Sequence, residues 1–165
     1  MSLEWRMHES LRFLDLSHNI ISVFPSQLLK FPKLQTLLLD HNRISSFALI
    51  PTTDERMPSS SLRILSFHHN QIDLLPDLIY HLCSGLVELW IHSNLLSSLP
   101  LRMSLLTDLQ TLTLSSNRLK QLPDVFNPMT SLTELWIQQN PLVHVPQSMW
   151  QRKIPILLHN LAGGS

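Results

Sequence analysis

The sequence predicts an α/β repeat solenoid, an arc of stacked units with a parallel β-sheet on its concave face and loops or short helices on its convex side. The pattern Leu-x-x-Leu-x-Leu-x-x-Asn-x-Leu recurs six times, and its asparagines are 23 to 28 residues apart. This spacing is the period of stacked-repeat architectures. One such unit cannot bury its own apolar face, so neighbouring units must stack on one another. The resulting arc favours binding over catalysis, because it has a broad surface and no pocket by default.

Two apolar columns define the expected strands. They are two residues apart, the period of a strand with one face turned inward. Their members are Leu14, Leu37, Leu65, Leu89, Leu112 and Leu135, then Leu16, Leu39, Phe67, Ile91, Leu114 and Ile137. The asparagines that follow are Asn19, Asn42, Asn70, Asn94, Asn117 and Asn140. Because an asparagine side chain carries both donors and an acceptor, we expect stacked asparagines to satisfy the backbone of neighbouring turns as a ladder.

The units from Leu109 to Pro123 and from Leu132 to Pro146 resemble the repeats of intracellular Ras-group leucine-rich-repeat proteins, such as Ras-pathway and cell-polarity scaffolds. The resemblance covers residues 11 to about 150. It is specific for the fold and far less specific for function. It implies protein–protein recognition on the concave sheet, usually in signalling. The long second repeat and the small number of units depart from the family pattern.

We expect one domain over residues 1–165. The repeats occupy 11–33, 34–61, 62–85, 86–108, 109–131 and 132–153. Residues 1–10 form either an N-terminal half-repeat or a short polar cap. Residues 154–165 form a C-terminal cap and tail, because Ile154, Leu157, Leu158 and Leu161 have helical spacing and two glycines follow as a stop. The second repeat carries an insertion, which we interpret as a spacer loop, with a phosphorylated loop as the alternative.

Composition restricts the classes of partner. The formal net charge is zero, so nothing favours nucleic acid or an acidic membrane surface. No stretch is long and apolar enough for membrane insertion, and residues 1–10 lack the apolar core of a signal peptide. The single cysteine, Cys83, excludes an intramolecular disulfide. We therefore expect a cytoplasmic, monomeric protein with a protein partner.

Motifs that carry catalytic chemistry are absent from the sequence. It contains no phosphate-binding glycine loop, no H-E-x-x-H and no G-x-S-x-G, and it has only three glycines. We interpret Cys83 as a buried structural thiol, since the pattern places no base beside it. The sequence therefore predicts that the chain is not an enzyme, with no catalytic residues, no cofactor and no metal site.

Two tryptophans mark the outward face of the expected sheet. Trp90 and Trp136 occupy the same outward column, and each follows a glutamate by two residues, Glu88 and Glu134. The repeat itself does not require an outward tryptophan, and aromatic anchors dominate interface energetics. We predict that these four residues contact a partner. The alternative is that each ring lies flat across its neighbouring strands as local packing.

Outward polar residues complete the predicted partner-binding surface. They are Asp40, His41, His68, His69 and His92. Clustered imidazoles can bind zinc or respond to pH, but a flat ladder gives little convergence of ligands. A polar recognition strip is therefore the favoured interpretation.

The function that the sequence favours is a non-catalytic protein–protein interaction module, an intracellular signalling scaffold or adaptor that binds its partner on the concave face. The alternative is a recognition segment of a larger kinase, GTPase or receptor whose catalytic part lies outside this chain.

Overall fold

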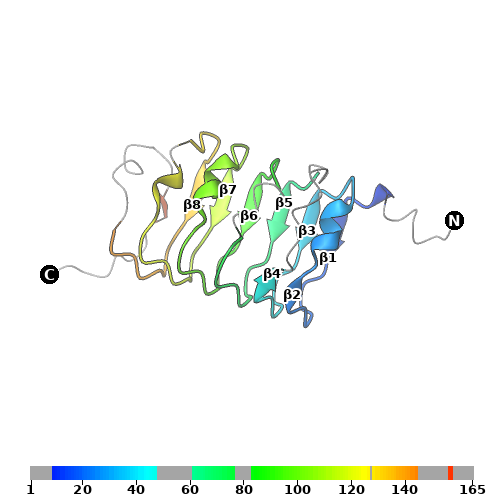
Figure 1. Ribbon diagram of the computed structural model, residues 1–165, viewed down its shortest axis with the longest axis horizontal. Helices are drawn as coiled ribbons and strands as arrows, with labels where there is room; N and C mark the ends of the chain where they lie inside the picture. Colours follow the sequence, from blue (N-terminus) through cyan, green and yellow to red (C-terminus); the bar gives the residue numbers. More distant parts are fainter. Residues whose placement is uncertain (1–8, 48–60, 77–82, 127, 145–155, 158–165) are drawn as a thin grey trace.

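A computed structural model describes residues 9–47, 61–76, 83–126, 128–144 and 156–157. Seven short parallel strands lie side by side in chain order and form the main sheet (Figure 1). They are β1 (Phe13–Asp15), β3 (Thr36–Leu38), β5 (Ile64–Ser66), β6 (Glu88–Trp90), β7 (Thr111–Thr113), β8 (Glu134–Trp136) and β9 (Ile156–Leu157). The predicted parallel-strand solenoid is confirmed, with one strand of the main sheet in each of the six predicted repeats and β9 beyond the last of them.

The inward leucine column sets the register of the sheet. Leu89 pairs with Leu65 on one side and with Leu112 on the other, and the same column continues in both directions. In the central repeats these side chains are completely buried, whereas Leu14 at the first strand is only partly covered. Each repeat thus covers the core of the next, and Leu14 in the first strand is less covered than its counterparts in the central repeats.

A second, smaller sheet lies outside the main one. It pairs β2 (Val23–Phe24) with β4 (Ser46–Phe47) in parallel. The rings of Phe24 and Phe47 lie 5.3 Å apart, and both meet the buried ring of Phe67 nearly edge-on, at 6.3 and 6.2 Å. These edge-to-face contacts are a favourable geometry for aromatic pairs, and they join the first three repeats.

The segments that return from one strand to the next contain short 3-10 helices. They are η1 (Ser26–Lys30), η2 (Leu101–Leu105) and η3 (Asp124–Phe126). Pro25 and Pro100 immediately precede η1 and η2, where a residue without an N–H loses no helical hydrogen bond. The expected loops and short helices are present, but such short turns do not confirm the α/β class.

The asparagine ladder is confirmed. Asn94 Nδ2 donates to the carbonyl oxygens of Phe67 (3.0 Å) in the preceding repeat and Ile91 (3.1 Å) in its own. Its Oδ1 accepts from the backbone N–H of Ile72 at 3.0 Å. Asn42, Asn70, Asn117 and Asn140 make the equivalent bonds. Among the described residues, Asn19 in the first repeat bonds only within its own turn.

The predicted C-terminal helix is wrong where the structure tests it. Ile156 and Leu157 form β9, which pairs in parallel with β8. The last strand of a sheet presents unpaired backbone groups, and pairing with β9 satisfies those of β8. The rest of the expected cap, the insertion between Phe47 and Leu62 and nearly all of residues 1–10 lie outside the described residues.

Candidate functional site

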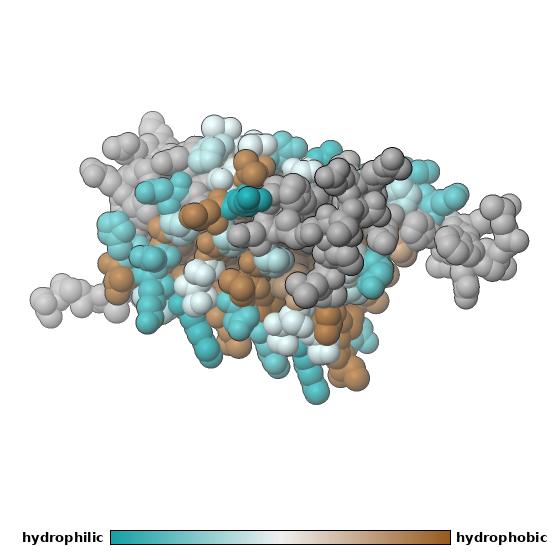
Figure 2. Space-filling view, viewed as in Figure 1, coloured by the Kyte–Doolittle hydropathy of each residue, from teal (hydrophilic) through white to brown (hydrophobic). Residues whose placement is uncertain are grey.

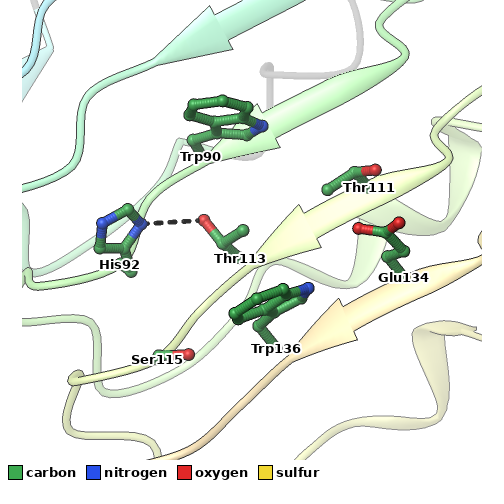
Figure 3. Close-up of a pocket in the computed structure, with 7 residues that line it drawn as sticks. All are labelled: Trp90, His92, Thr111, Thr113, Ser115, Glu134 and Trp136. Atoms are coloured by element: carbon green, nitrogen blue, oxygen red, sulfur yellow. Dashed lines mark hydrogen bonds between the residues drawn. The ribbon is translucent and has the colours of Figure 1, made fainter. Parts of the chain in front are cut away.

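A groove of about 340 Å³ opens on the outer face of the main sheet, across β6, β7 and β8. We call it the tryptophan groove (Figure 3). Its walls and floor are Trp90, His92, Thr111, Thr113, Ser115, Glu134 and Trp136. Figure 3 shows the two indole rings on either side of Thr113, with Thr111 and Glu134 toward one end and His92 and Ser115 toward the other.

Strand register builds the groove. Trp90 pairs with Thr113, which pairs with Trp136. Neighbouring strands are about 4.8 Å apart, so the strands that carry the two tryptophans lie roughly 10 Å from each other. A small threonine on the strand between them leaves this space open. In the same way, Thr111 separates Glu88 from Glu134.

The two indoles differ in burial. Trp136 is 40% exposed, whereas Trp90 is half-buried. The Nε1 atom of Trp90 is buried and has no hydrogen-bond partner among the described residues. Each ring therefore combines some local packing with an accessible surface.

Exposed apolar side chains are not confined to this groove. Figure 2 shows hydrophobic and hydrophilic residues intermixed on the face in view. Leu101 on η2 and Val143 after β8 are more exposed than Trp136. Exposure alone therefore does not single out a site. The tryptophan groove is distinguished by its concave shape and by its paired aromatic walls.

His92 joins the groove to a second group of side chains. Its Nδ1 lies 3.2 Å from Thr113 Oγ1, and its ring stacks on that of His68 at 4.3 Å. Burial is the main cause that lowers the pKa of His92, with a smaller contribution from His69. His92 is therefore neutral near pH 7, and Glu134 supplies the carboxylate of the groove.

The second group, the histidine strip, consists of His18, His41, His68, His69 and His92, which lie just beyond the strands of the first four repeats. His18, His41 and His69 have φ angles of 58, 52 and 52°. Histidine tolerates this left-handed region better than most residues. The same turn position is taken by Ser93, Ser116 and Gln139 in the later repeats. The column of His18, His41 and His69 therefore reflects in part the geometry of the turn. The outward position alone did not predict this positive φ.

Asp40 is largely buried, at 7% exposure. It accepts hydrogen bonds from the Ser66 hydroxyl and from the backbone N–H of His68 (3.0 Å), and its Oδ2 lies 3.3 Å from His68 Nε2. Burial lowers the pKa of His68 to about 4, although the Asp40 charge opposes this shift. Asp40 thus organises the strip from below.

This arrangement differs from a hydrolytic triad. In a triad the histidine bridges the nucleophile and the carboxylate, whereas the fully buried Ser66 donates directly to Asp40. Cys83 is also unsuited to catalysis, because burial raises the pKa of its thiol to about 12. The expected structural thiol is confirmed by its burial.

The predicted site residues therefore fall into two sets. Trp90, Trp136, Glu134 and His92 line the groove, and Glu88 lies on β6 beside it. Asp40, His41, His68 and His69 belong to the histidine strip. The sequence reasoning missed Thr111, Thr113 and Ser115 as groove residues; the available signal was a small side chain between two tryptophans of one column.

Comparison with known proteins agrees with the repeat fold. Residues 84–142 match a family described as Leucine rich repeat, and residues 10–31 and 61–82 match a second family of the same description. A solved structure of an LRR protein from Leptospira interrogans is 25% identical, with a TM-score of 0.54. The match covers 92% of this chain and 49% of that one, so the chain spans about half of its length. No curated protein matches the sequence. Within the described ranges, no helix has the length and apolar character needed to cross a membrane.

Proposed function

Because this chain belongs to the leucine-rich-repeat proteins, we propose that it is a non-catalytic protein–protein interaction module, acting as an intracellular signalling scaffold or adaptor. Such repeats are generally protein-binding modules. The observation that carries the proposal is the tryptophan groove on the outer face of the sheet, the concave face of the expected arc. The partner lies across β6, β7 and β8 and inserts a side chain between Trp90 and Trp136.

The walls of the groove favour one kind of inserted side chain. Two indole faces attract a cation or a flat apolar group, and Glu134 adds a carboxylate at one end. His92 does not oppose a cation, because its lowered pKa keeps it neutral near pH 7. An arginine satisfies all of these features, since its planar guanidinium stacks on aromatic rings and pairs with carboxylates. We therefore expect a basic segment of the partner to occupy the groove.

Quantitative affinity capture from cell extract tests this function. The bait proteins are the wild type, Trp90→Ala/Trp136→Ala and a matched control, Leu101→Ala, which truncates an exposed apolar residue on η2. Proteins retained by wild type and control but lost by the double variant are candidate partners. For an identified partner, truncation of either tryptophan should weaken binding by about 2 kcal/mol or more, the scale of an interface hot spot.

Two further measurements keep the result interpretable. Melting curves establish that each variant is folded before its binding is compared. Glu134→Gln then tests the charge of the inserted group, because a basic side chain should bind this variant more weakly and an apolar one should not. Full partner capture by a folded double variant would reject the groove as the binding site.

A further inference from the structure

The histidine strip contains a cluster that neither the core nor the tryptophan groove uses. His41 stacks on His18 and on His69, with ring centroids 4.4 Å apart in both pairs. The ring of His68 lies 5.3 Å from that of His41 and 5.2 Å from that of His69, nearly perpendicular to each. Three imidazoles from two adjacent repeats therefore meet at one point of the surface.

The ring nitrogens of His41, His68 and His69 can act together. One nitrogen of each ring lies within 4.8 Å of the other two. Two ligands of a tetrahedral zinc ion, bound at about 2.0 Å, are about 3.3 Å apart. His41 and His69 are exposed, so rotation of their side chains can close this difference while the turns that carry them stay fixed. His68 is half-buried, so its ring is less free to rotate than the other two.

His68 has the orientation of a metal ligand. Its Nε2 faces Asp40 Oδ2 at 3.3 Å, and Asp40 is itself held by Ser66 and by the His68 backbone. A proton on Nε2 leaves Nδ1 as the lone-pair nitrogen. This Nδ1 is buried, and no described residue bonds to it. Buried polar atoms without a partner are rare and call for an ion or a water, and a metal-binding histidine typically directs its other nitrogen to a carboxylate.

We propose that His41, His68 and His69 bind a divalent transition-metal ion, namely Zn²⁺, and that Asp40 positions His68 to coordinate it. Three neutral imidazoles suit zinc, copper or nickel and disfavour calcium and magnesium, which select oxygen ligands. Three protein ligands leave a fourth position, which water fills in the isolated chain. The expectation of a metal-free surface assumed that a flat ladder cannot converge. That assumption overlooked His68, which Asp40 holds and whose ring lies 5.3 and 5.2 Å from those of His41 and His69.

The test is metal titration of the full chain, purified without a histidine tag and treated with a chelator. We expect calorimetry to give one Zn²⁺ per chain. Co²⁺ should give the visible absorption bands of a low-symmetry nitrogen site, and Zn²⁺ should raise the melting temperature, since a ligand bound only by the folded state stabilises it.

Matched variants locate the site. His41→Asn/His69→Asn removes two ligands but keeps residues that tolerate the positive φ of these turns, so we expect it to fold and to lose the cobalt bands. Asp40→Asn should weaken Zn²⁺ binding by about 10- to 100-fold, as expected for a positioning residue. His144→Asn changes an exposed histidine away from the strip and should bind like the wild type. Absence of the bands in the wild type, or equal binding by the folded double variant, would overturn the proposal.

Discussion

The outer face of the sheet has two halves that share one backbone and differ in chemistry. Just beyond β3 and β5 a buried carboxylate organises stacked imidazoles, and Asp40 and Ser66 are almost fully enclosed. On β6, β7 and β8 a threonine strand separates two partly exposed tryptophans and leaves a groove. Beneath both halves lie the same leucine column and the same asparagine ladder. The comparison teaches that the inward residues fix the scaffold, while the outward residues are free to vary from repeat to repeat.

The largest stability effect should come from the first half. Asp40→Ala removes an acceptor and leaves the Ser66 hydroxyl and the His68 N–H buried without a partner, so we expect unfolding free energy to fall by about 3 kcal/mol. Chemical denaturation measures this loss. Asp73→Ala, which truncates an exposed aspartate, is the control. A loss no larger than that of the control would mean that the network contributes nothing.

The asparagine ladder should stabilise both halves to the same extent. Asn42→Ala, in the repeat of His41, and Asn94→Ala, in the repeat of Trp90, each truncate a buried side chain and remove equivalent bonds to the backbone. Each should destabilise the protein by about 2 kcal/mol. Asn19→Ala removes only bonds within an exposed turn and should have a much smaller effect in the same thermal melts. Unequal losses at Asn42 and Asn94 would show that the two halves do not share one scaffold.

Acidification should affect the histidine half of metal-free protein. Burial lowers the pKa of His68 from 6.5 to about 4; Asp40 opposes this shift, and the charges of His92, His69 and His41 add to it. The unfolded chain thus takes up a proton near pH 6.5 that the folded chain accepts only near pH 4. Stability is fully present above pH 6.5 and falls as the pH decreases toward 4.

The size of that effect is about 1 kcal/mol at pH 5, because a half-buried imidazole is partly screened by solvent. Denaturation curves at pH 7 and pH 5, recorded with a chelator present, measure it. His68→Gln removes the titrating group and should make the curves less sensitive to pH. A wild type equally stable at both pH values would contradict the assignment.

The smallest stability effect should come from the second half. Trp136→Ala truncates a ring that is 40% exposed, so we expect unfolding free energy to change by less than about 1 kcal/mol. Trp90→Ala, at a more buried position, should cost more in the same experiment. A Trp136 variant that loses more stability than the Trp90 variant would identify its ring as packing rather than as a binding surface.

The sequence was sufficient for everything that repeats with the period of the unit. The strand positions, the inward leucines and the bonds of the asparagine ladder follow from residues within one repeat and its nearest neighbour. It was insufficient at the last strand. Ile156 and Leu157 fall in a stretch with helical spacing, but β8 presented an edge, and backbone pairing outweighed the local pattern.

The sequence by itself also determined which side chains point outward, because alternation along a strand is a local property. Only the tertiary structure decided what those side chains do. Asp40 looked like an exposed contact and is enclosed by Ser66 and His68, which come from the next repeat. The groove exists because Thr113 lies between two tryptophans that are 46 positions apart in the chain. Burial, hydrogen bonding and hollow shape depend on the sizes of side chains on neighbouring strands, and those neighbours are set by stacking.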